Sequence, residues 1–221
     1  MIRKMLLLTV LILSVATLVQ AQPDPNFRFQ RAGKWDYSLQ TRYIGEKDYK
    51  ADNGSALSFQ DDLGWGFGFN YNFNQKFSLG VEFSWHSINY TALVIPEEDP
   101  YAAETYSNSL DTSKFGVAGS WNILEGHFTP YVSGGIGWAL IDTNIYAGVG
   151  SGCYWDPYWG YVCGTYPTTY GTNATAYNIG LGGRLELGKS FFMRLGYEYS
   201  GMSVDVIEGQ NTIRFDMGFF N

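Results

Sequence analysis

The stretch Leu63-Gly64-Trp65-Gly66-Phe67-Gly68-Phe69-Asn70-Tyr71-Asn72-Phe73 decides how this chain folds. Every odd position carries a large apolar side chain, and every even position carries Gly or Asn. Successive side chains of a β-strand point to opposite faces, so this alternation gives one strand two faces of opposite chemistry. A period of two therefore predicts a strand over residues 62–74.

The same period recurs along the chain and predicts an all-β fold with eight strands. Their ranges are 33–46, 62–74, 76–93, 109–123, 128–146, 174–188, 190–204 and 211–220. Tight turns at 74–76, 124–127 and 188–189 alternate with long loops at 47–61, 94–108 and 147–173, and with a shorter loop at 205–210. An even number of strands with short turns at one end and long loops at the other is typical of an antiparallel up-and-down transmembrane β-barrel.

One face of these strands consists mostly of Gly, Ser, Asn and Ala, with bases and acids in equal number. The lumen of an eight-stranded barrel is just wide enough for side chains to fill it, and opposite charges in it can pair. We expect a lumen charge network made of Asp36, Arg42, Glu82, Lys114, Arg184, Glu186, Arg194, Glu198, Arg214 and Asp216.

The other face is rich in Phe, Leu, Ile, Trp and Tyr and has almost no charge, which suits lipid. Aromatic residues fall at both ends of the strands, as two interfacial girdles require. They are Trp35, Tyr71, Trp121 and Phe191 near the tight turns, and Tyr43, Trp65, Trp85 and Tyr177 near the long loops. In hydrocarbon a sheet pairs all its backbone groups only by closing into a barrel. A soluble secreted β-sandwich would also alternate and is the alternative.

The first residues predict export. Arg3 and Lys4 precede an apolar run, and small residues at Val19 and Ala21 form a processing site, so we expect a signal peptide over residues 1–21. A transmembrane anchor is the alternative, but the run is shorter than the ~20 residues that span a bilayer. We expect a short periplasmic segment over 22–32 and the barrel domain over 33–221.

Charge excludes a nucleic-acid partner. The chain has 14 Lys+Arg against 21 Asp+Glu, a net charge of -7, and no basic cluster follows Lys4. Charged residues make up 16%, below the roughly 25% of an ordinary soluble domain, while aromatic residues make up 18%. Part of the surface is therefore expected to face lipid. No cofactor or metal motif is visible, and His127 has no companion at ligand spacing.

Two segments and the last strand carry a resemblance to a known family. Phe128-Thr129-Pro130-Tyr131-Val132-Ser133-Gly134-Gly135-Ile136-Gly137-Trp138 and Tyr177-Asn178-Ile179-Gly180-Leu181-Gly182-Gly183-Arg184, with an aromatic-rich last strand, resemble the small outer-membrane β-barrel superfamily of opacity-protein and OmpA/OmpX type. The resemblance covers the whole mature chain and implies a bacterial outer-membrane location. Family members usually end on an aromatic residue that the barrel-assembly machinery recognises, whereas this chain ends Phe219-Phe220-Asn221.

His86 is the one histidine within a predicted strand, and lipid A-modifying barrel enzymes of similar architecture use a His/Ser/acid arrangement. Ser87 is adjacent, so the two side chains of a strand point to opposite faces and a direct contact between them is excluded. We therefore predict no enzymatic activity, with a lipid A-modifying enzyme as one alternative and a narrow channel for small or hydrophobic solutes as another.

Cys153 and Cys163 are the two cysteines of the chain, and they lie in one predicted external loop. In an oxidising envelope compartment this pair predicts a disulfide. The enclosed segment offers candidate recognition residues Tyr154, Trp155, Tyr158, Trp159 and Tyr161. Exposed aromatic side chains form either a recognition surface or a lid that packs on the barrel mouth.

The expected role is structural or one of surface interaction, of the adhesion type. Outer-membrane lipid, lipopolysaccharide and the barrel-assembly machinery are the expected partners, with a host, glycan or phage ligand at the external loops. Acidic residues gather in those loops, where they form a solvated rim or a weak divalent-cation site. They are Glu46, Asp48, Asp52, Asp61, Asp62, Glu97, Glu98, Asp99, Glu104, Asp156, Asp205 and Glu208.

Overall fold

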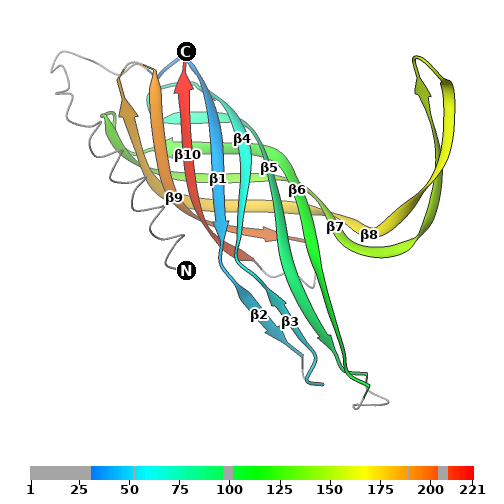
Figure 1. Ribbon diagram of the computed structural model, residues 1–221. Coiled ribbons are helices and arrows are strands. Elements are labelled where there is room, and N and C mark those ends of the chain that lie inside the picture. The colour runs from blue at the N-terminus through cyan, green and yellow to red at the C-terminus, as the bar shows by residue number, and fades with distance from the viewer. Residues whose placement is uncertain (1–30, 52, 97–101, 189, 204–208) are drawn as a thin grey trace.

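The computed structural model describes residues 31–51, 53–96, 102–188, 190–203 and 209–221, and every regular element in these ranges is a β-strand (Figure 1). The strands are β1 (Trp35–Ile44), β2 (Lys47–Lys50), β3 (Ala56–Phe59), β4 (Asp62–Asn72), β5 (Phe77–Val94), β6 (Glu104–Asn122), β7 (Phe128–Asp156), β8 (Gly160–Leu187), β9 (Phe191–Met202) and β10 (Gln210–Phe220). The predicted signal peptide and residues 22–30 lie outside the described residues. No helix in the described part is long and apolar enough to cross a membrane.

Eight of these strands form a closed antiparallel ring. Each of β4 to β9 pairs with the next strand in the chain, and β4 also pairs with β1. The ring closes where β10 pairs with β1, from Asp36 opposite Phe220 to Ile44 opposite Thr212. The predicted eight-stranded antiparallel barrel is therefore confirmed.

Side chains alternate across the barrel wall. In β1 the even-numbered residues from Asp36 to Ile44 are buried, while Trp35, Leu39 and Tyr43 face outward. Two inward glycines show how close the strands lie: a Cβ on Gly80 would collide with the carbonyl oxygen of Phe69, and a Cβ on Gly137 would collide with that of Phe115. The outer face is apolar and the lumen is narrow, as the alternation indicates.

The inward face changes character along the strands. In β5 it runs from Ser84 and His86 to Ile88 and Tyr90, so polar side chains fill the middle of the lumen and apolar ones fill its external end. We call this apolar cluster the collar; it consists of Ile44, Phe59, Ile88, Tyr90, Leu110, Ala139, Ile141, Ala174 and Ala176. The collar was not predicted from the sequence, because the alternation continues unchanged where the inward residues become apolar.

Three predicted loops contain strands, and those boundaries were wrong. The 47–61 loop holds β2 and β3, a hairpin whose second strand pairs with β5. In the 94–108 loop, β6 begins at Glu104. The 147–173 loop continues β7 and β8 as one hairpin. Register shifts between Asp142 and Gly148 interrupt the alternation, and the predicted strand ends within this stretch, at residue 146.

The β7–β8 hairpin extends far beyond the barrel. The last β7 residue that also pairs with β6 is Asp142, opposite Asp111. We call the remaining hairpin, residues 143–170, the arm. Figure 1 shows the arm leaving the barrel sideways, away from the hairpins formed by β2–β3 and β5–β6.

Candidate functional site

The lumen near the tight turns is organised around Asp36, which is fully buried. Its carboxylate lies 2.6 Å from Arg184 Nη1 and 2.9 Å from Arg194 Nη2, and it accepts a 2.8 Å hydrogen bond from Asn72. Arg184 Nε also pairs with Glu186 at 3.0 Å. One carboxylate from β1 thus holds arginines from β8 and β9, so the pairs connect opposite parts of the wall.

Arg31, which precedes β1, fills the end of the lumen near the tight turns. It was not predicted from the sequence. Its side chain is fully buried, ion-paired with Glu186, and donates hydrogen bonds to the carbonyls of Gln75 at 3.0 Å and Gly126 at 3.2 Å. Those carbonyls belong to two tight turns, so Arg31 ties the segment before β1 across the periplasmic mouth. A single arginine ahead of the first strand carries no periodic signal.

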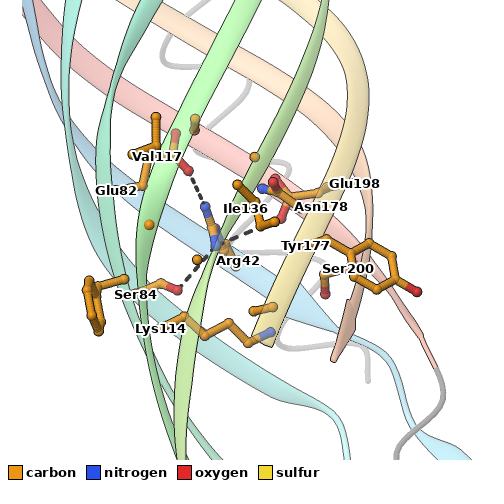
Figure 2. Close-up of a pocket in the computed structure, with 16 residues that line it drawn as sticks. Arg42, Glu82, Ser84, Lys114, Val117, Ile136, Tyr177, Asn178, Glu198 and Ser200 are labelled. Atoms are coloured by element: carbon orange, nitrogen blue, oxygen red, sulfur yellow. Dashed lines mark hydrogen bonds and ion pairs between the residues drawn. The ribbon is translucent and has the colours of Figure 1, made fainter. Parts of the chain in front are cut away.

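A second group of charges fills the middle of the lumen (Figure 2). Glu82 of β5 lies 2.9 Å from Arg42 Nη2 and 2.6 Å from Arg214 Nη2. Arg214 also pairs with Glu198 at 3.3 Å and with Asp216 at 2.8 Å. Side chains from β1, β5, β9 and β10 therefore meet in one network. Buried charges are stable when each is paired in this way.

Lys114 is the member of the predicted network that stands apart. The other nine predicted residues form ion pairs, whereas Lys114 forms none within 4 Å among the described residues. Figure 2 places Lys114 beside Ser84 and Ser200 around a cavity of about 50 Å³. A second cavity, beside Asn70, has a volume of about 10 Å³. Spaces of this size have room for at most one or a few water molecules.

His86 and Ser87 point to opposite faces, as sequence analysis expects. His86 is buried in the lumen, with Nδ1 3.4 Å from a carboxylate oxygen of Asp62. Ser87 is exposed and donates a 2.5 Å hydrogen bond to Asp111. The histidine and the serine thus have different acidic partners, and they do not form the relay that a serine nucleophile requires.

The arm carries the exposed aromatic side chains that sequence analysis singled out. Their exposed fractions are 64% for Tyr154, 63% for Trp155, 90% for Tyr158, 82% for Trp159 and 80% for Tyr161. They do not pack on the barrel mouth as a lid. Outside the arm, the external mouth is filled by the collar.

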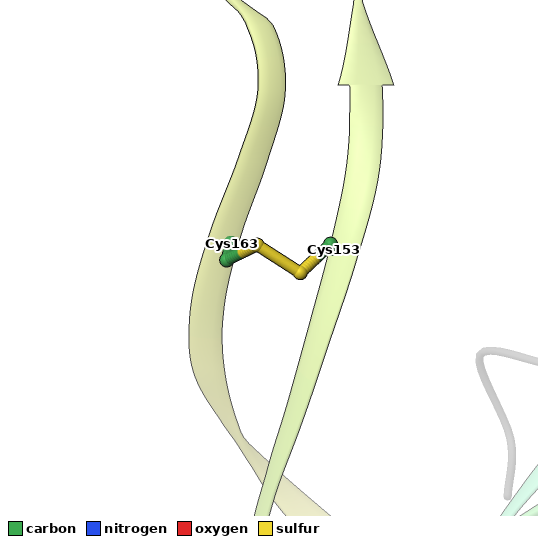
Figure 3. The surroundings of a disulfide bond; sticks show 2 residues. All are labelled: Cys153 and Cys163. Carbon is green, nitrogen blue, oxygen red and sulfur yellow. A yellow bond between two sulfur atoms is a disulfide. The ribbon is translucent and has the colours of Figure 1, made fainter.

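A disulfide joins the two strands of the arm, between Cys153 and Cys163 (Figure 3). The two residues are directly opposite in the register, and Trp155 lies opposite Tyr161 two pairs further on. Side chains two residues apart on a strand share a face, so this aromatic pair flanks the disulfide on one face of the arm. At the tip, Asp156 accepts backbone hydrogen bonds that fix the turn.

Asn144 anchors the base of the arm, and sequence analysis also missed it. Its φ is 54°, in the left-handed region that Asn tolerates better than most residues. The side-chain amide of Asn144 donates to Ser109 Oγ at 3.0 Å and to Asp111 at 2.7 Å. Its backbone carbonyl accepts a hydrogen bond from the Asn108 side chain at 2.7 Å. The backbone N–H donates to Asp142 at 2.9 Å. These bonds connect the bulge in β7 to β6 and fix the direction in which the arm leaves.

Acidic loop residues do not gather into a metal centre among the described residues, where no three His, Cys, Asp or Glu side chains come together suitably. Glu46, Asp48, Asp61 and Glu104 belong to the external side of the barrel, on or beside the β2–β3 and β5–β6 hairpins. Several predicted rim acids lie outside the described residues: Asp52, Glu97, Glu98, Asp99, Asp205 and Glu208.

A closed ring of eight antiparallel strands, with an apolar outer face and a charged lumen, defines a small transmembrane β-barrel. The chain belongs to the outer membrane protein beta-barrel domain family, whose model matches residues 5–218. Its location is therefore the bacterial outer membrane, as the resemblance implies. No curated protein matches the chain.

The chain is also similar to solved structures of low sequence identity. OprG from Pseudomonas aeruginosa is 11% identical, with 88% of this chain and 97% of that chain covered and a TM-score of 0.48. Ail of Yersinia pestis, solved in complex with the heparin analogue sucrose octasulfate, is 15% identical, with 86% and 99% covered and a TM-score of 0.47. Neisserial surface protein A is 10% identical, with 83% and 95% covered and a TM-score of 0.45.

Proposed function

We propose that this barrel is a non-enzymatic surface-interaction protein whose arm binds a ligand outside the cell. One observation carries the proposal: the arm presents Tyr158, Trp159 and Tyr161, each at least 80% exposed, at the tip of a disulfide-linked hairpin. Trp and Tyr are the residues that most often dominate binding energy at interfaces. A soluble surface rarely gathers such side chains without a partner.

Preorganisation supports the same role. The disulfide and the bonds of Asn144 restrain the arm before any ligand arrives, which reduces the entropy lost on binding. Asp156 is the one charged residue between Asp142 and Arg184, and its carboxylate is engaged with the turn. An arm without Lys or Arg suits an uncharged ligand, such as a neutral glycan or an apolar protein surface, better than a sulfated or phosphorylated one.

The lumen supports a closed barrel more than a channel. Ion pairs cross it at two levels, its cavities near those pairs measure about 50 and 10 Å³, and the collar fills its external end. A hydrated ion meets charged side chains and then an apolar constriction, which opposes wetting. We propose that the charge network serves to hold the wall together.

The arrangement around His86 supports a protein without lipid A-modifying activity. The imidazole faces the lumen, and Ser87 faces outward toward Asp111. We expect no release of fatty acid from lipopolysaccharide by the unaltered protein or by a His86→Ala variant. Release by the unaltered protein that His86→Ala abolishes would establish the enzyme instead.

The apolar outer face implies contact with outer-membrane lipid and lipopolysaccharide, and we propose that the barrel-assembly machinery recognises the last strand. There, Phe219 faces outward and is 58% exposed, while Phe220 is buried in the lumen. We expect replacement of Phe219 by Ala to lower the yield of assembled barrel.

The experiment for the arm uses a double variant, Trp155→Ala with Trp159→Ala, in vesicles that carry the folded protein. The vesicles are tested for attachment to immobilised neutral polysaccharides and to cultured host cells. Tyr106→Ala is the matched control, because Tyr106 is 52% exposed and lies outside the arm, on β6. We expect attachment to fall at least tenfold in the double variant and to persist in the control. Equal attachment of all three proteins, with each barrel folded, would contradict the proposal.

A further inference from the structure

Neither edge of the arm has a partner strand in the part of the chain that the structure describes, because β8 pairs with β9 only from Ala176 onward. The pairing of β6 with β7 ends at Asp142, whereas β7 continues to Asp156 with β8 alone beside it. Inside the barrel both edges of β7 are paired. An unpaired edge presents a row of free N–H and C=O groups that can template another strand.

The register shows which backbone groups are free. The Cα atoms of Cys153 and Cys163 are 4.0 Å apart, the short separation of a pair that exchanges no hydrogen bonds. The N–H and C=O of Cys153 therefore point away from β8, and those of Ser151 do the same because the pattern repeats every two residues. Val149 lies opposite Pro167 in the same kind of pair, which agrees with the missing N–H of proline.

The two edges of the arm differ. On the β8 edge, Pro167 lacks the outward N–H that a partner strand would need. The β7 edge has no proline and no charged residue from 143 to 155. Proline and charge are the devices by which proteins protect an exposed edge, so one edge of this arm is protected and the other is open.

We propose that residues 149–155 of β7 pair with the same edge of a second copy, in antiparallel orientation. The pairing joins two arms into a four-stranded sheet. It uses the backbone of the edge, so it leaves the aromatic faces free and doubles the number of aromatic tips. It therefore goes beyond the proposed ligand binding and does not depend on it.

Membrane geometry favours a second copy as the occupant of this edge. All copies of a barrel have the same orientation in the membrane, so a two-fold axis along the membrane normal can bring the same edge of two arms together. The arm leaves the barrel sideways and then turns, as Figure 1 shows, so its outer half stands clear of the barrel wall. The uncharged β7 edge brings no like charges together, and confinement to one bilayer raises the effective concentration of the copies.

The test uses two matched proline variants. Ser151→Pro removes an outward N–H from the β7 edge, and Thr165→Pro removes one from the β8 edge at the residue directly opposite. Neither N–H belongs to the β7–β8 ladder, so both variants keep the hairpin. Donor- and acceptor-labelled copies are reconstituted in phosphatidylcholine vesicles at high dilution, and energy transfer between them is measured. Formation of the disulfide and heat-modifiable migration on a gel check that each arm and barrel is folded.

We expect energy transfer above the random-proximity level in the unaltered protein and in Thr165→Pro, and a fall to that level in Ser151→Pro. Three results would each overturn the proposal: no excess transfer in the unaltered protein, full transfer in Ser151→Pro, or equal loss in both proline variants. If the unaltered protein shows no excess transfer, a peptide from another protein would remain as the occupant of the β7 edge. Loss of ligand attachment in the tryptophan double variant is a separate readout, so the two ideas fail independently.

Discussion

Asp36 and Arg184 lie 148 residues apart in the chain and face each other across the lumen, with a carboxylate oxygen 2.6 Å from the guanidinium. Both side chains have no exposed surface. The first strand is thus fastened to β8 by a buried ion pair as well as to its neighbours by backbone bonds.

Replacement of Asp36 by Ala should destabilise the barrel, because Arg184 and Arg194 would remain buried without this carboxylate. Breaking one partner of a buried ion pair costs about 3–5 kcal/mol. Urea unfolding of the detergent-folded protein measures the loss. Glu104→Ala, which removes an exposed acid from the start of β6, should change the free energy of unfolding by under about 0.5 kcal/mol. Similar effects of the two changes would show that the Asp36 pairs add no stability.

Planar bilayers should record little or no steady conductance for the unaltered protein, since ion pairs and the collar obstruct the lumen. Arg184→Ala and Glu82→Ala test the alternative. If large, regular openings occur, these two changes should alter ion selectivity in opposite directions, because one removes a positive charge and the other a negative charge. Such openings would favour the narrow-channel function over the closed barrel.

Reduction of the disulfide should loosen the arm and leave the barrel intact. The ring closed by Cys153 and Cys163 is short, so the bond contributes about 3 kcal/mol at most to the order of the arm. We expect faster proteolysis within residues 143–170 after reduction, with unchanged heat-modifiable migration. Loss of heat-modifiability would mean that the barrel depends on the arm.

The base of the arm should be sensitive to acid. Asp142 lies outside the apolar belt, and the hydrogen bond from Thr169, with a second from the backbone of Asn144, lowers the pKa of its carboxyl group. A lowered folded pKa adds stability above the unfolded value of about 3.9, and this stability is lost as pH falls through the folded value.

Proteolysis of the arm should therefore accelerate below about pH 4 in the unaltered protein. Asp142→Asn keeps an oxygen acceptor but does not titrate, so its cleavage rate should depend less on pH over that range. If the two proteins respond to acid identically, another group controls the base of the arm.

The barrel could be predicted from sequence because its cause is local. The alternation in residues 63–73 predicts which side chains face lipid. The charged residues at the inward positions of the other strands follow from the same period of two. The pairing of those charges, such as Asp36 with Arg184, depends on which strands face each other across the lumen. Arg31 and Asn144 act through contacts with distant turns and strands. A single residue that does not belong to a periodic pattern cannot be recognised from the sequence pattern alone.

The arm was predicted as a loop for a physical reason. A two-stranded ribbon exposed on both faces needs no apolar side, so its residues alternate weakly. Its disulfide and its exposed aromatic residues could be predicted, because each depends on single residues. The strands that carry them could not be predicted, because a strand is recognised by its alternation. The open β7 edge could be located once the register placed Val149 opposite Pro167.

The pairing of β1 with β10 has a consequence for how the protein is made. The other contacts of the wall join strands that follow one another in the chain, except that the β2–β3 hairpin lies between β1 and its partner β4. These contacts can form hairpin by hairpin, a topology of short sequence separations. The pairing between the first and last strands can form only after the eleven residues of β10, 210–220, have been made. Until they arrive, two long edges stay open to aggregation. We therefore expect a chain that stops before β10 to accumulate as an aggregate or as a chaperone-bound intermediate, however complete its other strands are.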